Sequence, residues 1–219
     1  MSELQSLVRA NATTFPERIL NNLLSSLDGH PHFVGKARED TVLLVFFLIK
    51  FLSHCLDVGS RMADRTFAFL FEQPGQPLEQ ALQHALYTCL RLQVFGFPQH
   101  TVVNELPDVG TGRADVAVVF PTWRNVIEVK RELADASRAG LRAYLGQAAS
   151  YLLTGPKIGF LVVLDLCSQK DWALTLEDNC WVETVQTDRD SVARKVLVFR
   201  IPGCRKPPSS VKTPKDAIY

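Results

Sequence analysis

The sequence predicts an α/β fold with a helical region before it, on three observations. Apolar residues recur at helical spacing as far as Leu92, which is typical of amphipathic helices. From Thr101 the period changes, and two β-rich runs follow at 101–106 and 114–120. The run 158–166 is apolar throughout, as in a strand of a sheet that is covered on both faces.

The first 76 residues are expected to form a helical N-terminal region. Pro16 precedes a segment, 17–27, whose apolar residues are helically spaced, and Asp28-Gly29 ends it. A further short helix is expected over 61–71. The Pro- and Gly-containing break at 73–77 then marks a boundary.

The most apolar segment of the chain is the run 41–56, with Asp40 expected as its helix cap. Lys50 and His54 interrupt the run, and it is shorter than the ~20 residues that a membrane-spanning helix needs. We therefore expect a buried helix or an interface helix. In the second case, a homodimer through the N-terminal helices is expected.

Residues 77–204 are expected to form the main domain. The sequence predicts in order a helix, a hairpin, a third strand, a helix and two further strands. These elements cover 78–92, 101–106 with 114–120, 125–130, 136–153, 158–166 and 195–201. The connection 107–112 contains two glycines and fits a hairpin turn. The end, 205–219, is rich in Pro, Ser and Lys and is expected to be a flexible basic tail.

Composition limits the function classes. A net charge of +1 argues against a protein that binds phosphates over its whole surface, but it leaves room for a local basic cleft. The five cysteines form no C-x-x-C pair and are expected to be reduced. Residues 1–15 lack the apolar core of a secretory signal, so a cytoplasmic location is expected. The sequence has no Gly-rich phosphate loop, G-x-S-x-G elbow or zinc pattern.

The strand at 125–130 carries the first chemical signal. Side chains two apart point to the same face of a strand, so Glu128 and Lys130 project together while Ile127 and Val129 point to the other face. Two charges inside an apolar strand are costly unless each has a partner or a metal.

Asp115 adds a second carboxylate. It begins the preceding strand, and hairpin pairing would bring it beside Glu128. Two adjacent carboxylates repel each other unless a cation lies between them. Mg²⁺, or Mn²⁺ in its place, suits hard oxygen ligands, and the Val129 carbonyl could add one more.

These residues resemble the PD-(D/E)xK nuclease superfamily over roughly residues 77–166. The family places an Asp on the second strand and E-x-K on the third, here Asp115 and Glu128-Val-Lys130. The pattern Gln147-x-x-x-Tyr151 on the next helix is typical of the RecB-like branch. The resemblance implies a restriction-endonuclease-like core, with a mixed central sheet flanked by helices.

The resemblance also implies a function. It indicates a Mg²⁺-dependent nuclease that hydrolyses phosphodiester bonds, DNA rather than RNA, in defence or repair. The implied catalytic residues are Asp115, Glu128, Lys130 and Gln147. Glu79 matches an acidic residue that many members place near the metal, although a carboxylate at a helix N-terminus also favours the helix dipole.

Several assignments stay open at this stage. The literal Pro-Asp pair, Pro107-Asp108, falls in the predicted turn, so Asp115 is the favoured ligand. Glu132 is interpreted as a solvent-side charge at the strand end. The candidate nucleic-acid contacts are Gln147, Tyr151, Arg113, Arg138 and Arg142.

The sequence leaves two alternatives open, one for the arginines and one for the function. Arg138 and Arg142 are expected on one helix face, where they could instead pair with Glu132 and Asp135. The alternative function is a catalytically inactive module of the same fold that binds nucleic acid or supports assembly.

Overall fold

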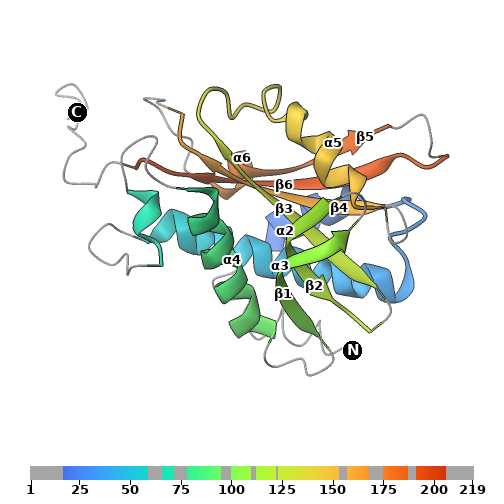
Figure 1. Cartoon of the computed structure of the whole chain (residues 1–219). Coiled ribbons are helices and arrows are strands. Elements are labelled where there is room, and N and C mark those ends of the chain that lie inside the picture. The colour runs from blue at the N-terminus through green and yellow to red at the C-terminus, as the bar shows by residue number, and fades with distance from the viewer. Residues whose placement is uncertain are drawn as a thin grey trace.

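The computed structural model describes residues 17–58, 66–71, 78–94, 100–109, 112–121, 123–152, 157–167, 175–186 and 191–205, apart from the side chains of 106–113. A six-stranded sheet in the order β1-β2-β3-β4-β6-β5 forms its centre (Figure 1). Strands β3, β4 and β6 are mutually parallel and the remaining pairs are antiparallel. The strands are β1 (Thr101–Val109), β2 (Gly112–Val119), β3 (Arg124–Glu132), β4 (Ile158–Asp165), β5 (Cys180–Val185) and β6 (Arg194–Pro202).

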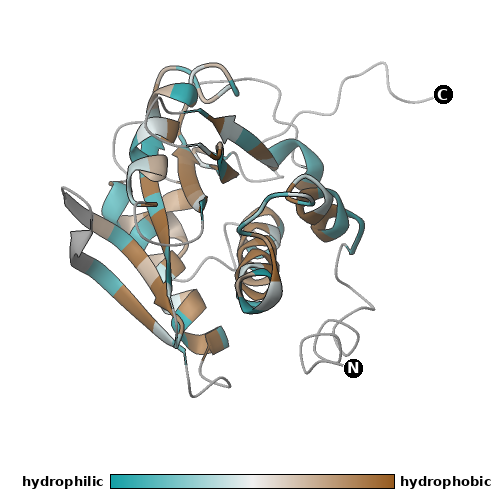
Figure 2. Ribbon diagram, turned by 90° about the vertical axis from the view of Figure 1, so that its right-hand side faces the viewer, coloured by the Kyte–Doolittle hydropathy of each residue, from teal (hydrophilic) through white to brown (hydrophobic). Residues whose placement is uncertain are grey.

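Helices cover both faces of this mixed sheet, which confirms the α/β prediction. The helices are α2 (Glu17–Ser25), α3 (Gly35–Asp57), α4 (Glu79–Val94), α5 (Arg142–Ser150) and α6 (Leu176–Asn179), with a 3-10 turn η1 (Ala68–Leu70). Along β4, Phe160 and Val162 join the core under α3 and α4, while Leu161 and Val163 join the core under α5. Figure 2 shows hydrophobic residues along the strands and on the helices.

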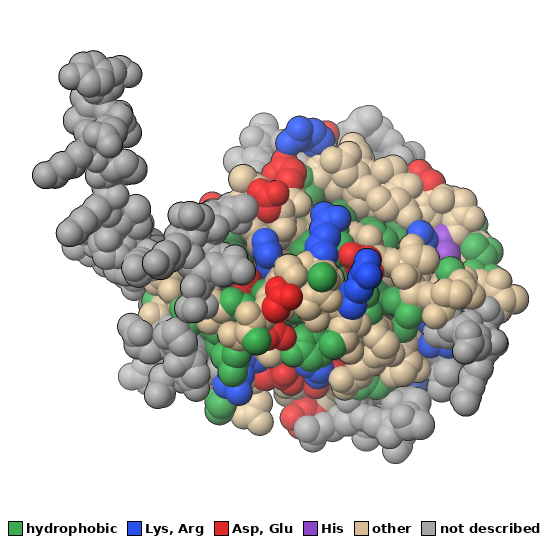
Figure 3. Space-filling model, turned by 90° about the horizontal axis from the view of Figure 1, so that it is seen from above, with side chains coloured by type: hydrophobic (Ala, Val, Ile, Leu, Met, Phe, Trp, Pro, Cys, Tyr) green, Lys and Arg blue, Asp and Glu red, His purple; other side chains and the backbone are tan. Residues whose placement is uncertain are grey.

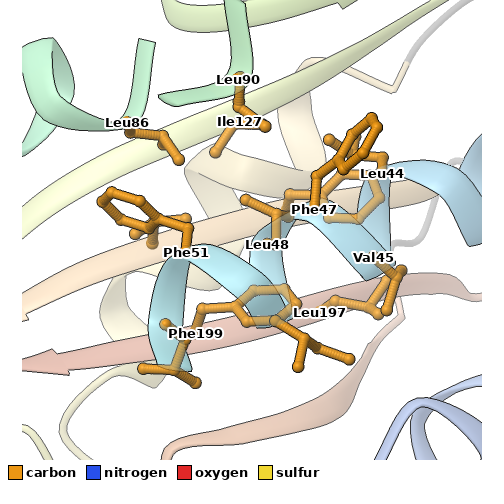
Figure 4. Packing of buried hydrophobic residues seen from close by; sticks show 14 of the residues in the cluster. Leu44, Val45, Phe47, Leu48, Phe51, Leu86, Leu90, Ile127, Leu197 and Phe199 are labelled. Atoms are coloured by element: carbon orange, nitrogen blue, oxygen red, sulfur yellow. The ribbon is translucent and has the colours of Figure 1, made fainter. Parts of the chain in front are cut away.

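Helix α3 is the centre of the larger core. Its Phe47, Leu48 and Phe51 lie among side chains of α4 and β6, including Leu86 and Phe199 (Figure 4). The burial predicted for the run 41–56 is therefore observed within a single chain, and the homodimer expected from an interface helix stays a prediction. Among the described helices, none has the length and apolar character needed to cross a membrane.

The start of α3 differs from the prediction. Asp40 is not the helix cap but a buried residue inside the helix, which begins at Gly35. Lys36, one turn earlier, lies 3.1 Å from an Asp40 carboxylate oxygen. This ion pair makes a buried carboxylate tolerable inside the helix, because an opposite charge offsets part of its desolvation.

The N-terminal helices and the sheet share one core. Leu27 and Phe46 belong to the same buried cluster as Leu86 and Ile127. At the other end of the chain, the Arg205 guanidinium donates to the carbonyl of Leu56, at the end of α3. Residues 206–219, most of the predicted tail, lie outside the described residues.

Further elements differ from the prediction. Strand β1 extends to Val109 and β2 begins at Gly112, so most of the connection predicted over 107–112 is strand. Of the helix predicted over 61–71, the described residues contain only the short turn η1. Helix α5 begins at Arg142 instead of residue 136, and residues 138–141 before it form a turn. Strand β5 was not predicted, and it lies at the edge of the sheet with several half-exposed residues. The cysteines form no disulfide.

Candidate metal centre

Three carboxylates from three elements surround the ammonium group of Lys130. Glu128, two residues earlier on β3, forms an ion pair with it. The Lys130 Nζ lies 3.8 Å from Oε1 of Glu79, the first residue of α4, and 4.0 Å from Oδ2 of Asp115 on β2. The structure thus brings together all four of these residues, which the sequence placed in one site.

The position of Asp115 follows from how the β2–β3 ladder ends. The paired register runs from Val119↔Arg124 to Val116↔Ile127, and Asp115 lies just beyond it. There its Oδ2 accepts a hydrogen bond of 2.8 Å from the Val129 amide. In an extended strand the N–H and C=O of one residue point to the same side. The Val129 carbonyl therefore also faces the Asp115 side.

Glu128 is the most buried member of the site, with a side chain 1% exposed. Neither of its oxygens has a hydrogen bond of good geometry, so it depends on the Lys130 ion pair and on the nearby Tyr151 hydroxyl. Burial raises the pKa of Glu128, Lys130 opposes this rise, and the Asp115 charge adds to it. A buried carboxylate with so few partners is a favourable place for a cation.

The charges at this site do not balance. Burial alone would lower the pKa of Lys130, but Glu128 first, and then Glu79 and Asp115, raise it overall. Lys130 therefore remains charged at neutral pH. With the three carboxylates ionised, the sum is −3 + 1 = −2. Burial also raises the pKa of Glu79.

Gln147 and Tyr151 lie at the end of α5 on the side of Glu128. The Tyr151 ring packs against Ala114 and Val126, and its hydroxyl lies near the Glu128 carboxylate. Gln147 is exposed, and its Nε2 donates to the Tyr151 hydroxyl at 3.4 Å. Tyr151 therefore lies next to Glu128, while Gln147 lies next to Tyr151 and faces solvent.

The predicted arginine contacts are only partly placed here. Arg138 and Arg142 do not share a helix face, because Arg138 precedes α5 and its guanidinium lies 5.0 Å over the Trp181 ring. Arg142 is exposed at the first residue of α5. The side chain of Arg113 lies outside the described residues, as does that of Asp108.

The sequence suggested that Glu132 is a solvent-side charge, and the structure shows that this is wrong. Its Oε1 accepts hydrogen bonds from three successive amides, those of residues 133–135, at 2.6 to 3.1 Å. Its Oε2 accepts from the Tyr144 hydroxyl at 2.8 Å. Glu132 thus joins the end of β3 to α5, the helix that carries Gln147. Its two-residue spacing from Lys130 on one strand face was the signal that could have identified it.

Glu132→Gln should lower stability in a pH-dependent way. Burial would raise the pKa of Glu132, but the amides and the Tyr144 hydroxyl together hold it below its ordinary value. Since the folded pKa lies below the unfolded one, the stabilisation is complete above the unfolded pKa, about 4.3, and is lost as pH falls through the folded pKa. We expect a melting temperature lower by about 2–4 °C at pH 7, the scale of about 1 kcal/mol in a chain of this size.

The check is a series of thermal melts of both proteins from pH 7 to pH 3. The gap between the two proteins should narrow as the pH falls below about 4. Tyr144→Phe removes one of the four hydrogen bonds and should show a smaller loss. A gap that stays constant across this pH range would contradict the assignment.

Within the described residues, no group of three or more His, Cys, Asp or Glu side chains is placed so that it could hold a metal ion. Any ion at Asp115 and Glu128 would therefore need ligands other than a third such side chain. Comparison with models of protein families, with curated proteins and with solved structures finds no match to this chain.

Proposed function

We propose that this chain is a metal-dependent nuclease that hydrolyses phosphodiester bonds, with DNA as its substrate. The observation that carries the proposal is the convergence of Glu79, Asp115 and Glu128 about Lys130. The order of elements from α4 to β4 is helix, three strands, helix and strand. We infer from both that the core is restriction-endonuclease-like, in keeping with the resemblance to PD-(D/E)xK nucleases.

The residues present fit a hard divalent cation such as Mg²⁺ or Mn²⁺. Mg²⁺ in proteins commonly takes one or two carboxylates and completes its octahedron with water and phosphate oxygens, so a third acidic ligand is not required. Asp115 and Glu128 would hold the ion, together with the Val129 carbonyl, and Glu79 would act through water or a second ion. When bound, such an ion polarises a phosphate oxygen and makes a water molecule more acidic.

The side chains of this chain would divide the remaining work. The Lys130 ammonium stabilises the negative charge that develops on the phosphoryl oxygens, or orients the attacking water. Tyr151 holds the Glu128 carboxylate in place, and Gln147 presents its exposed amide to the substrate. Arg142, exposed at the start of α5, is available to a phosphate of the backbone.

One face of the molecule is of mixed charge. Figure 3 shows Lys and Arg side chains interspersed with Asp and Glu on the face seen from above, and no broad basic field among the described residues there. Binding that relies on few phosphate contacts should depend only weakly on salt. This favours recognition of nucleic acid at the site itself over coating of a long duplex.

Metal binding is tested with Asp115→Asn, which removes the charge and keeps the size of the side chain. At a Ca²⁺ or Mg²⁺ concentration of about 100 times Kd, linkage should stabilise the wild type by about 2.7 kcal/mol, or about 5–10 °C in melting temperature. The variant should lose most of this shift, measured by thermal melts and by titration calorimetry. Asp135→Asn, the same change at an exposed aspartate in the loop after β3, is the matched control. Equal heats from Asp115→Asn and wild type would remove Asp115 as a ligand.

Catalysis is tested with labelled linear, nicked, circular, branched and single-stranded DNA, each incubated with Mg²⁺ or Mn²⁺. Cleavage of at least one form by the wild type, and its loss in Glu128→Gln, is the expected result. Binding without cleavage on every substrate and metal would favour the alternative, an inactive module of the same fold. The presence of Asp115, Glu128 and Lys130 together argues for the active form.

A further inference from the structure

Gln83 is a buried polar residue that the proposed chemistry does not use. It lies on α4, four residues after Glu79, so the two side chains share one helix face. Its side chain is only 6% exposed. A buried amide is retained at a cost unless its hydrogen bonds are made, so the contacts of Gln83 indicate its role.

Both hydrogens of the Gln83 amide are directed toward other elements. Nε2 donates to Oδ1 of Asn104, on β1, at 2.9 Å and to the main-chain carbonyl of Asp115, on β2, at 3.0 Å. A main-chain carbonyl can only accept, so the NH₂ group must face it. The Gln83 side chain thus joins α4 to both strands of the hairpin, β1 and β2. Its contact on β2 is with Asp115, whose carboxylate lies in the site.

These hydrogen bonds fix the position of α4 on the sheet, which apolar burial alone does not determine. Leu82 and Leu86 of α4 are in the core, but hydrophobic burial is not directional and permits small sliding of a helix on a sheet. Hydrogen bonds have narrow limits of distance and angle. The bond to the Asp115 carbonyl therefore sets where α4 sits along β2, and with it the separation of Glu79 from Asp115.

We infer that Gln83 is a positioning residue, which holds Glu79 and Asp115 at the separation needed to receive a divalent cation beside Lys130. The inference rests on the proposed function. Gln83 itself would contact neither the ion nor the substrate. It acts through the backbone of Asp115 and through the helix that carries Glu79.

The test compares Gln83→Met with Gln80→Met. Methionine keeps the length of glutamine and removes the donor, while Gln80 lies on an exposed part of the same helix. Titration calorimetry with Mn²⁺ alone, well below the melting temperature of every variant, should show Gln83→Met binding about 10-fold more weakly, as is typical when a partner of a ligand is removed. Gln80→Met should match the wild type. High Mn²⁺ should restore cleavage by Gln83→Met.

A purely structural role would lower the melting temperature of Gln83→Met and leave its Mn²⁺ affinity unchanged, and that result would overturn the inference. If Gln83→Met does not fold, Gln83→Leu replaces it, because leucine also favours a helix and also lacks the donor to the Asp115 carbonyl. The variant should then bind Mn²⁺ more weakly than the wild type, and an unchanged affinity overturns the inference. Absence of Mn²⁺ binding by the wild type would instead refute the metal site itself.

Discussion

Lys130→Met is expected to slow single-turnover cleavage of DNA by about 10²-fold or more while leaving DNA binding nearly intact. The Lys130 ammonium lies within 4.0 Å of three carboxylates, two of which are the proposed metal ligands Asp115 and Glu128. A positive charge there contributes most when negative charge develops at phosphorus, and little when the substrate first binds. Cleavage is measured with saturating enzyme and Mg²⁺, and binding is measured with Ca²⁺.

Two variants sharpen this prediction. Lys130→Arg should not restore the full rate, because a planar guanidinium cannot place a compact charge at the same point. Lys195→Met, the same change on β6 where Lys195 donates to Thr184, should cleave like the wild type. Wild-type rates in Lys130→Met would remove Lys130 from the mechanism.

Lys130→Met should also lower the melting temperature without metal, and a bound divalent cation should offset this loss. Lys130 forms the ion pair with the buried Glu128 carboxylate, so its loss leaves that charge poorly compensated. Without metal, the melting temperature should fall. With Ca²⁺, the gain in melting temperature should exceed that of the wild type, because the ion no longer competes with the ammonium for Asp115 and Glu128. An equal gain in both proteins would mean that Lys130 and the ion do not share these ligands.

The part of the site that the sequence predicted depends on local geometry. Residues two apart on a strand share a face, and this alone placed Glu128 beside Lys130. A short hairpin connection then brought Asp115 to the neighbouring strand. Patterns of this kind involve residues that are close in the sequence, so they can be recognised without the tertiary structure.

The parts that the sequence did not predict depend on contacts between distant segments. The bond from Gln83 to Asn104 spans 21 residues, and nothing in the helix periodicity of α4 distinguishes Gln83 from its exposed neighbour Gln80. Glu132 looked like a surface charge because its partners are backbone amides, which every sequence contains. Strand β5 was not predicted because an edge strand with half-exposed residues has a weak apolar pattern.

Helix α3 gives the largest expected effect on stability. Phe47 is 4% exposed and lies in the main core, so Phe47→Asp would remove a buried ring and introduce a buried carboxylate. Loss of an aromatic side chain from a core costs about 3–5 kcal/mol, and an uncompensated charge adds several more. Domains are stable by only about 5–15 kcal/mol in total. We therefore expect Phe47→Asp to be unfolded or aggregated, as measured by circular dichroism and light scattering.

The control for this change is Leu92→Asp, which adds the same charge to α4 at a side chain 74% exposed. It should keep the melting temperature of the wild type to within about 2 °C, since exposed substitutions rarely change stability by more than about 0.5 kcal/mol. The comparison also separates the two readings of the apolar run. A folded Phe47→Asp monomer obtained from a dimeric wild type would mean that α3 forms an interface between copies of the chain, and a folded variant of unchanged mass would contradict both readings. The position of Phe47 among side chains of α4 and β6 favours unfolding, because only 4% of Phe47 is exposed.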